Sequence, residues 1–479
     1  MKNKKLYILA ILAIAFSSCK KELDEVNINP NAPEIPVPDY LLTGTTKATV
    51  DAYWGVTNNM NSSLLFAQQW AKVQYTEEDR FIYSNSSFTS LWSTAYAQSI
   101  PGYNKIIELG DAQGNSVYKG VALVLRSWTF LLLTDAYGDV PYTQAGKIKQ
   151  FITPVYDKQK DVYYGVLEDL KSALTALNLK SGNGISGDII YAGSTENWKK
   201  FANSLRLRIA LRIADKDPAK AKQVIDEIKV EGGLYISSNL ENAKLDYDVS
   251  PQQNPVAASF ETRNDYRISK TIIDRLTGLN DARLPIYASK TENAPNGYVG
   301  IPNGSTNSEA SAIGLANSSK PGAYFLDPKA PAVILSYAEV LFDRAEAAAR
   351  GFTTENAQDL YKQAITASYA QYGLTNLNSN IEAYLNSAAV QYDASNYKKS
   401  IGEQKWIALF GQGLEAWAEQ RRLDYPQLTA SVNTVLNGKI PVRFIYPGSE
   451  QSLNGQNYKN AVSSQGADLL TTKLWFDAF

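Results

Sequence analysis

The sequence of 479 residues contains no histidine and a single cysteine, Cys19. Without histidine the chain cannot build a Ser-His-Asp or Cys-His nucleophile, a histidine general base or a zinc site with histidine ligands. One cysteine excludes both a disulfide within the chain and a cysteine metal cluster. An enzyme built on this sequence would therefore have to use carboxylates, lysine, tyrosine or a bound metal. No motif in the sequence predicts a cofactor or a metal site.

The sequence also lacks an excess of positive or negative charge. The chain has 47 Lys and Arg against 48 Asp and Glu, a formal net charge of -1, and no basic stripe stands out after residue 21. This balance gives no indication of nucleic-acid binding. Hydrophobic residues make up 44% of the chain and charged residues 20%, which is ordinary for a globular protein with a large core. The 30 Tyr and 8 Trp would fill that core or form flat platforms for a ligand.

The first residues have the features of an export signal. Lys2, Lys4 and Lys5 precede an apolar run over residues 6–16, which is too short to span a bilayer. Two small serines and then Cys19 follow this run, as in a bacterial lipoprotein signal. We therefore expect a signal peptide over residues 1–18, cleavage before Cys19, and acylation of Cys19.

A tether follows the expected lipid anchor. Residues 27–38 carry four prolines and show no periodicity, so residues 19–38 are interpreted as an extended link between the lipid and the folded protein. The remainder, residues 39–479, is expected to form a single α-helical domain.

Paired amphipathic helices dominate that remainder. Apolar residues recur at helical spacing in three successive pairs of segments, 119–137 with 161–177, 196–214 with 217–232, and 332–350 with 354–372. In the second pair, Asp217 is the expected N-cap and Pro218 the first helical residue. The spacing is close to that of tetratricopeptide repeats. The predicted fold class is mainly α, a tetratricopeptide-like scaffold of helix pairs with long irregular segments on the ligand-binding side.

A further helix is expected over residues 404–426, either opening a fourth pair or packing across the array. It places Trp406, Phe410, Leu414 and Trp417 on one face. We expect its charged residues, Glu415, Glu419, Arg421 and Arg422, to lie on the opposite, solvated face. In the earlier segment 196–214, we expect Arg206, Arg208 and Arg212 to form salt bridges between packed helices.

Three segments lack periodicity and interrupt the helices: residues 74–87, 234–329 and 438–479. A helix over 55–73 precedes the first of them. Long irregular segments in a compact protein are often functional, and the first two combine aromatic with charged residues. The candidate ligand-binding residues are Trp70, Tyr75, Glu78, Arg80, Phe81, Tyr83, Asn254, Arg263, Asp265, Tyr266, Tyr298 and Tyr324. The competing interpretation is that aromatic residues such as Trp70 only anchor the loop to the core.

Seven ordered sequence blocks resemble one known family. They are the NPN tripeptide at 29–31, LWSTAY at 91–96, DVPY at 139–142, NWKKFANSLRLRIALR at 197–212, AEVLFDRAEAAARG at 338–351, GLEAWAEQRRLDYP at 413–426 and PVRFIYP at 441–447. Together with the lipoprotein signal, they are similar to the SusD/RagB family of outer-membrane nutrient-binding lipoproteins.

The resemblance implies an α-helical body of four tetratricopeptide-like units with the ligand site on irregular segments. It also implies surface exposure at the outer membrane through the lipid anchor, an oligosaccharide or other nutrient as ligand, and a SusC-like TonB-dependent transporter as partner. No reaction is then catalysed.

Two alternatives remain open from the sequence. One is a carboxylate-based glycoside hydrolase on a helical scaffold, which would release new reducing ends from glycans. The other is a structural helical-repeat scaffold that holds other proteins.

Overall fold

The computed structural model describes residues 36–295 and 297–477. The predicted signal peptide, Cys19 and most of the tether lie outside these residues. Helices make up most of the described chain, and its strands form two small two-stranded sheets, β1 with β3 and β2 with β4. The predicted mainly α fold is confirmed.

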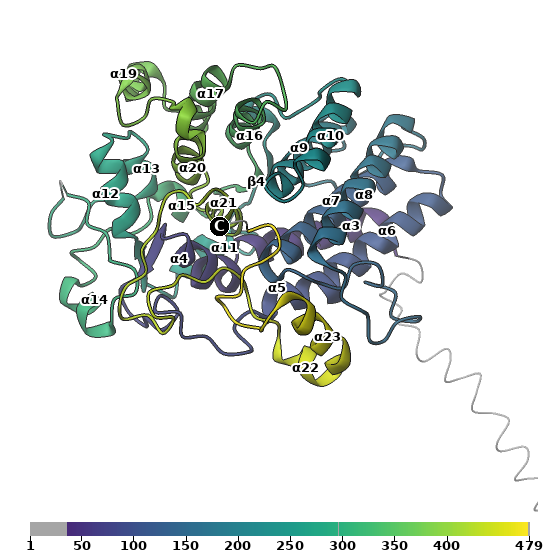
Figure 1. Ribbon diagram of the computed structural model, residues 1–479, viewed down its shortest axis with the longest axis horizontal. Helices are drawn as coiled ribbons and strands as arrows, with labels where there is room; N and C mark the ends of the chain where they lie inside the picture. The colour runs from purple at the N-terminus through teal and green to yellow at the C-terminus, as the bar shows by residue number, and fades with distance from the viewer. Residues whose placement is uncertain (1–35, 296, 478–479) are drawn as a thin grey trace, which may run out of the picture.

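The first half of the chain forms a layered array of helices, at the right of Figure 1. Each long helix packs on the next one in the sequence from α6 to α10, and α3 packs on α6. Its members are α3 (Pro38–Trp54), α6 (Ile100–Ala112), α7 (Ser116–Tyr137), α8 (Gln159–Leu179), α9 (Thr195–Ile213) and α10 (Pro218–Val230). α7 is the one described helix that is long and apolar enough to cross a membrane, and 89% of its most apolar window is buried, as in a core helix.

A second group of helices continues the array towards the top and centre of Figure 1. α16 (Tyr337–Ala349) packs on α9, α17 (Ala357–Ala370) and α20 (Tyr397–Ala408), and α20 packs on α21 (Gly413–Leu423). α21 also reaches α7 and α4 (Leu64–Phe66), so it crosses the array as well as closing it. The predicted pairing of helices is thereby confirmed, since α9 with α10 and α16 with α17 form adjacent pairs.

Shorter elements fill the remaining chain. Between α3 and α6 lie η1 (Val56–Ser63), α4, β1 (Trp70–Lys72), α5 (Thr89–Thr94) and η2 (Ala95–Ser99). The long middle segment holds η3 (Asn239–Glu241), β2 (Ala243–Leu245), α11 (Pro255–Phe260), β3 (Tyr266–Ile268), α12 (Lys270–Gly278), α13 (Leu284–Tyr287), α14 (Asn307–Ile313), α15 (Ala323–Leu326) and β4 (Ala332–Leu335). The rest are α18 (Asn376–Ser379), α19 (Ile381–Asn386), η4 (Ala394–Asn396), α22 (Gly448–Leu453) and α23 (Gly455–Gln465).

Several helix boundaries follow from local chemistry. Asp217 accepts a hydrogen bond from the backbone N–H of Lys220, and Pro218 opens α10, as predicted. The third predicted pair begins later than expected, because residues 332–335 form β4, which pairs with β2. The predicted helix over 55–73 ends at Phe66, and its last residues enter β1. In both places an apolar run that fits a helix is used as a buried strand.

The single helix expected over residues 404–426 is wrong, because the chain breaks between α20 and α21. Gly411 has a φ of +89°, which a residue with a side chain adopts only at a cost. A Cβ on Gly413 would lie 2.4 Å from the Asn59 side-chain oxygen, so the start of α21 needs glycine to approach η1. The two glycines therefore turn the chain and let α21 enter the core.

The charged face of α21 is buried, which corrects the assignment of this face to solvent. Glu415, Glu419, Arg421 and Arg422 are each at most 5% exposed. The Glu419 carboxylate forms two salt bridges of 2.6 Å, one with Arg212 on α9 and one with Lys405 on α20. The charged side chains of this helix therefore face other helices.

Two arginines of α9 supply opposing charge, as predicted for a set of interhelical salt bridges. Arg208 contacts Glu339 of α16 at 2.7 Å, and Arg212 contacts Glu415 at 2.6 Å. Arg422 contacts Glu346 of α16 at 2.6 Å. We call Arg208, Arg212, Lys405 and Arg422 with Glu339, Asp343, Glu346, Glu415 and Glu419 the buried ionic network.

Burial and charge act against each other in this network. Burial alone would raise the pKa of the Glu419 carboxyl, but the three cations around it outweigh burial, so its pKa lies well below the ordinary value. Glu419 is therefore ionised. Removing one cation would leave buried carboxylates without a counter-charge.

We predict that Arg212→Met destabilises the protein by ~3–5 kcal/mol, because Glu415, Glu419 and Asp135 each lose a contact with the same guanidinium. The measurement is the midpoint of urea unfolding followed by circular dichroism. Lys222→Met is the matched control, since it breaks an exposed pair with Asp226 and should leave the midpoint unchanged. Equal midpoints for both variants would contradict a structural role for the network.

Candidate functional site

The small antiparallel sheet of β1 and β3 brings together the two segments that were predicted to carry the ligand site. Trp70 pairs with Ile268, Ala71 with Arg267, and Lys72 with Tyr266. The ladder continues past β1, since Val73 donates its backbone N–H to the carbonyl of Asp265. Residues 74–83 leave one end of this sheet, and residues 263–265 enter β3 at the same end. Chain segments almost 200 positions apart therefore share one surface.

A compact group of charges lies at this end of the sheet. Lys72 is fully buried, and its ammonium lies 2.9 Å from Asp265 and 3.1 Å from Glu78. The guanidinium of Arg263 also pairs with the Asp265 carboxylate, at 2.8 Å. The ring of Tyr266 faces both cations, with the Lys72 nitrogen 4.8 Å from its centroid. Four of the predicted residues thus share one cluster.

Asp265 stays ionised in this setting. Burial alone would raise the pKa of Asp265, but hydrogen bonds from Arg263 and Lys72 outweigh it and the net pKa is lowered. The hydrogen bonding of Arg263 to Asp265 in turn raises the pKa of Arg263. The partly exposed guanidinium of Arg263 is therefore held in place and remains charged.

Tyr75 is the most exposed aromatic side chain near this cluster. Its relative exposure is 66%, and its backbone has a φ of +53°, which is unusual for a residue with a bulky side chain. The flanking residues explain how the turn is held. Val73 bonds to Asp265, and Thr76 donates its backbone N–H to the side-chain oxygen of Asn307. The backbone is thereby fixed on both sides of Tyr75, and its ring is exposed to solvent.

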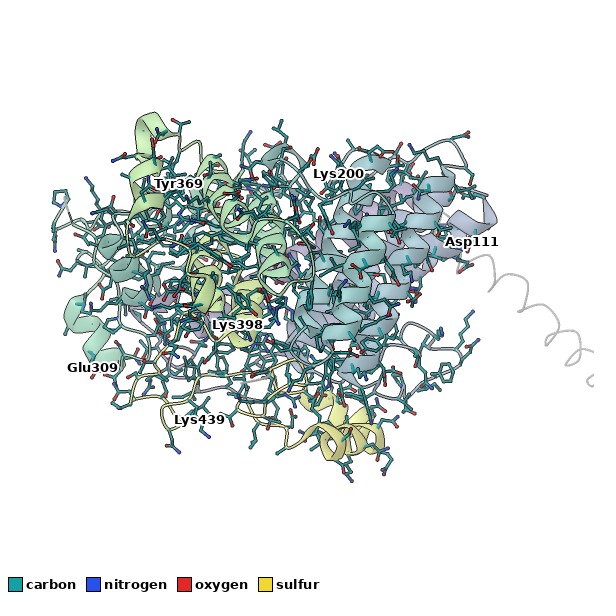
Figure 2. All side chains as sticks on the ribbon, turned by 45° about the horizontal axis from the view of Figure 1, so that its top comes forward. Asp111, Lys200, Glu309, Tyr369, Lys398 and Lys439 are labelled. Carbon is teal, nitrogen blue, oxygen red and sulfur yellow. The ribbon has the colours of Figure 1, made fainter. Side chains whose placement is uncertain are left out.

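Two more segments complete this surface. Asn307 at the start of α14 donates to Glu77, and Asn433 donates to Glu309. The backbone N–H of Val435 donates to the carbonyl of Arg80. Figure 1 shows α14 and the nearby C-terminal loop at the lower left, and Figure 2 labels Glu309 at this end of the molecule. We call the surface formed by residues 74–83, 263–266, 303–309 and 431–435 the loop surface.

Other predicted residues lie beneath the loop surface. Trp70 is 1% exposed and packs against Phe260 and Tyr266, and Phe81 is 2% exposed and packs against Phe66. Tyr83 donates its hydroxyl to the carbonyl of Asn61. These three rings anchor the loop to the core, as the competing interpretation of the sequence required.

The remaining candidates are not brought to the loop surface. Asn254 is buried, where it caps α11 and donates to the carbonyl of Ala330. Tyr324 packs among Phe325 and Tyr372 near α15. Tyr298 is partly buried against the core, and its neighbour Val299 bonds to Ser319. No contact in the described chain joins these three residues to Tyr75.

Sequence reasoning missed the polar residues that support the loop surface. Lys72 precedes the predicted loop and Asp79 lies within it, but nothing in their spacing indicated that both are buried. Asn303 and Asn307 lie more than 220 positions away along the chain. Asn303 donates to the carbonyl of Trp70 in β1 and to Asp79 within the loop, so it ties the loop to the sheet. Only the folded chain brings these groups together.

Among the described carboxyl groups of the loop surface, Asp79 has a strongly raised pKa. Burial raises the pKa of Asp79 to about 7, although hydrogen bonds from Asn303 and from the Lys72 backbone oppose the shift. Its two oxygens are occupied by these donors, at 2.9 Å and 3.2 Å, and the residue is 0% exposed. A carboxyl so enclosed does not reach a substrate in this conformation, so the perturbed titration reflects burial.

The arrangement suits the binding of a polar ligand. Tyr75 offers a ring face, and Arg263, Asn307 and Glu77 offer donors and acceptors beside it. Among the described residues, no group of three or more Asp, Glu, His or Cys side chains is placed to hold a metal ion.

A separate pocket of about 580 Å³ opens beside α6, α7 and α8, and no residue of the loop surface lines it.

Fold and loop surface together define a helical-repeat protein whose repeats support an irregular, solvent-facing polar and aromatic surface. A family model described as starch-binding and associating with the outer membrane matches residues 30–447. The chain belongs to this SusD-like family.

Solved structures with the same fold include a chitin-binding protein, with a TM-score of 0.83 and 30% sequence identity over 92% of this chain and 100% of that one. A SusD homolog from Bacteroides uniformis matches with a TM-score of 0.82 and 27% identity, over 92% of this chain and 100% of the other. A SusD homolog from Bacteroides thetaiotaomicron matches with a TM-score of 0.79 and 26% identity, over 91% and 99%. A comparison with curated protein sequences gives no match.

The titration of Asp79 predicts a pH-dependent stability. The pKa of Asp79 is higher in the folded than in the unfolded state, so its contribution to stability is fully present below the unfolded value and is lost as the pH rises through about 7. Relative to Asp79→Asn, the wild type should therefore lose on the order of 2–4 kcal/mol of unfolding free energy between pH 4 and pH 8.

Urea unfolding of both proteins at several pH values measures this difference. Asp274→Asn is the control, because the Asp274 side chain is 59% exposed. Its unfolding free energy should follow the wild type at every pH. If the difference between wild type and Asp79→Asn does not change with pH, Asp79 is ionised throughout and the assignment fails.

Proposed function

We propose that the protein is a cell-surface lipoprotein that captures a glycan on the loop surface and passes it to a SusC-like TonB-dependent transporter. The observation that carries this proposal is the exposed ring of Tyr75, held in an unusual backbone conformation while its neighbour Thr76 bonds to Asn307. The family description as starch-binding, and the chitin-binding protein among the similar structures, support a carbohydrate as the ligand class.

The chemistry of Tyr75 and its neighbours suits a sugar. A pyranose has a flat face of C–H groups that packs against an aromatic ring and a rim of hydroxyls that need donors and acceptors. Arg263 supplies donors, Glu77 supplies acceptors, and Asn307 supplies both. Each contact replaces one with water, so the net gain for each is small and the affinity stays modest. Modest affinity is adequate for a protein that must release its cargo to a transporter.

The proposed location rests on the first residues of the chain. We propose that residues 1–18 are removed as a signal peptide, that Cys19 is acylated, and that residues 19–38 tether the folded domain to the outer membrane. Several acyl chains on one residue give a stable anchor, whereas one chain alone gives marginal binding. The tether would let the domain stay close to its transporter while the loop surface faces outward.

The two other hypotheses have less support. A glycoside hydrolase needs an accessible pair of carboxyls, one of them with a raised pKa. Asp79 is enclosed, and Asp265 and Glu78 pair with Lys72. The exposed carboxyl of Glu309 has a lowered pKa because Thr306 donates hydrogen bonds to it, which does not suit a general acid. A purely structural repeat protein would not need an exposed tyrosine at a positive φ. Both features favour binding over catalysis or scaffolding.

We predict that Tyr75→Ala weakens glycan binding about two- to tenfold, which corresponds to the ~0.5–1.5 kcal/mol of an aromatic contact. The measurement is isothermal titration calorimetry of the purified protein, after a glycan panel that includes malto-oligosaccharides and chito-oligosaccharides has identified a ligand. Assays for new reducing ends run alongside, and steady turnover would favour the hydrolase instead.

Tyr40→Ala is the matched control for this experiment. Tyr40 is 78% exposed at the start of α3, and neither its chain position nor its contacts place it on the loop surface. Its loss should leave the affinity unchanged. If both variants bind as the wild type does, the ligand does not contact Tyr75 and the loop surface is not the binding site.

We predict that Cys19→Ser releases the protein from the membrane, because the thiol that would carry the lipid is lost. Fractionation of cells should place the wild type in the membrane pellet, from which only detergent extracts it, and the variant in the soluble fraction. Mass spectrometry of the first peptide of the wild type should show acyl chains on Cys19. A variant that stays in the pellet would rule out lipid anchoring at this residue.

A further inference from the structure

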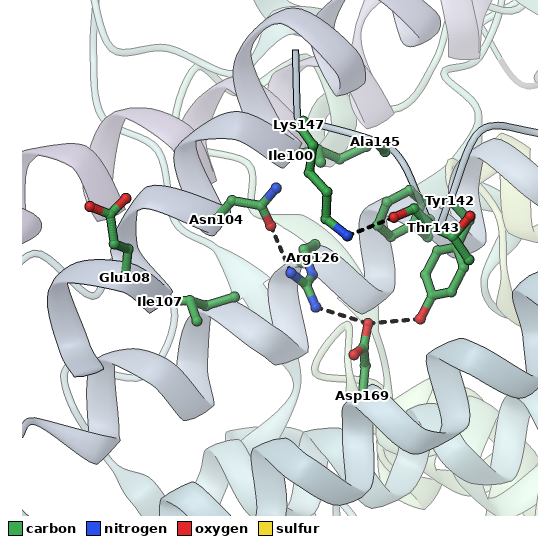
Figure 3. A pocket seen from close by; sticks show the side chains of 12 residues that line it. Ile100, Asn104, Ile107, Glu108, Arg126, Tyr142, Thr143, Ala145, Lys147 and Asp169 are labelled. Carbon is green, nitrogen blue, oxygen red and sulfur yellow. Dashed lines mark hydrogen bonds and ion pairs between the residues drawn. The ribbon is translucent and has the colours of Figure 1, made fainter. Parts of the chain in front are cut away.

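A second pocket lies within the helical array, away from the loop surface. It encloses about 580 Å³, which is within the range of small-molecule binding pockets. α6, α7 and α8 form its walls, and residues 142–147 cross one side of it (Figure 3). Figure 1 places these helices and α14 of the loop surface at opposite sides of the molecule. A ligand in this pocket would therefore not touch Tyr75.

Polar groups from all three helices meet in this pocket. Arg126 of α7 donates to Asn104 of α6 at 2.6 Å and to Asp169 of α8 at 3.0 Å. Tyr142 donates its hydroxyl to the same oxygen of Asp169 at 2.9 Å. Figure 3 shows these side chains pointing toward one another across the pocket. The three helices are thus linked by a chain of hydrogen bonds that faces open space.

This chain leaves hydrogen-bonding capacity unused. The Nε of Arg126 is buried and has no partner in the described part of the chain. The bonds described for Asn104 and Asp169 use one oxygen each, so the amide nitrogen of Asn104 and the second oxygen of Asp169 are left for another molecule. A ligand that both donates and accepts would satisfy the Asn104 nitrogen and the second Asp169 oxygen.

The charge of the pocket is balanced. Arg126 and Lys147 supply two positive charges, and Asp169 and Glu108 supply two negative ones. The Arg126 and Asp169 charges neutralise each other directly. A pocket without net charge gives no general preference to anions or to cations, and its partly buried polar groups penalise a wholly apolar ligand.

Apolar side chains form the rest of the lining. Ile107 of α6 is partly exposed towards the pocket, whereas Ile100 of α6 and Phe130 of α7 are buried behind its wall. Tyr142 packs edge-on against Phe130, with the ring centroids 4.8 Å apart. The Tyr142 ring also needs a glycine opposite it, since a Cβ on Gly165 would lie 2.3 Å from that ring. The aromatic wall is therefore fixed between α7 and α8.

We propose that this pocket is a second binding site for a neutral sugar unit, with Asn104, Arg126 and Asp169 bonding its hydroxyls and Ile107 contacting its C–H face. Hydroxyls both donate and accept, which matches the unused groups, and the sugar carries no charge. The inference builds on the proposed carbohydrate function. It adds a site on the repeat helices that would bind another part of the same oligosaccharide, or a second oligosaccharide.

The test is methyl NMR of the full chain in detergent, labelled at the δ1 methyl groups of isoleucine and titrated with maltotriose and chitotriose. We expect saturable shifts of the Ile100 and Ile107 methyl signals with at least one of the two sugars. Ile107→Trp should fill the pocket and abolish the shift at Ile100. Leu240→Trp is the control, because Leu240 is 94% exposed, and it should leave the Ile100 shift intact.

Tyr75→Ala separates this inference from the proposed function. The Ile100 shift should persist in this variant, while any binding at the loop surface weakens. The second site is overturned if the Ile100 and Ile107 signals do not shift at a sugar concentration 10-fold above the one that saturates the loop surface. If the sugar does not bind the loop surface, the absence of shifts at 20 mM sugar overturns it. Loss of the Ile100 shift in Tyr75→Ala likewise overturns an independent site. Unchanged overall affinity in Tyr75→Ala with intact pocket shifts would instead contradict the loop surface.

Discussion

The buried ionic network is the constraint on which the other features of this fold depend. Arg208 and Arg212 of α9, Lys405 of α20 and Arg422 of α21 meet carboxylates from α16 and α21 in the interior. Moving such charges out of water is costly, and their mutual attraction offsets the cost only when the contacts are short and well directed. Helices that shifted by one turn would lose these contacts and leave unpaired charges. The network therefore favours one alignment of α9, α16, α20 and α21.

The loop surface depends on this alignment indirectly. β1 and β3 have three residues each, and two such strands do not form a stable ribbon alone in water. Their stability comes from Trp70 and Tyr266, which lie in the core that the aligned helices create. The backbone of Tyr75 is then held by bonds of its neighbours to Asp265 and Asn307. An exposed ring can thus be fixed in position although it makes few contacts of its own.

Sequence reasoning identified the helices well and the loop surface in part. Long, strongly periodic segments such as residues 119–137 and the cap at Asp217 were predicted because local spacing and capping chemistry determine them. The loop with Tyr75, Glu78 and Arg80 stood out by its composition. Trp70 and Phe81 were also predicted to bind the ligand, but a large apolar ring in or beside a loop can face either the ligand or the core, and here both rings are buried. Asn303 and Asn307 gave no local signal at all.

The error at α21 has a clear physical cause. Periodicity separates an apolar face from a charged face, and a charged face normally meets water. It is buried here only because α9, α16 and α20 supply matching charges from positions far along the chain. Gly411 and Gly413 were visible in the sequence, but their role appeared only when η1 and Phe325 were seen to pack against them.

The sequence by itself therefore determined the helical class, the family resemblance and the exclusion of histidine and cysteine chemistry, since composition, capping and periodicity are properties of neighbouring residues. Only the tertiary structure decided which charged residues are buried, which aromatic rings face solvent, and which loops share a surface. Those outcomes depend on contacts between residues up to hundreds of positions apart, and no local pattern records such contacts.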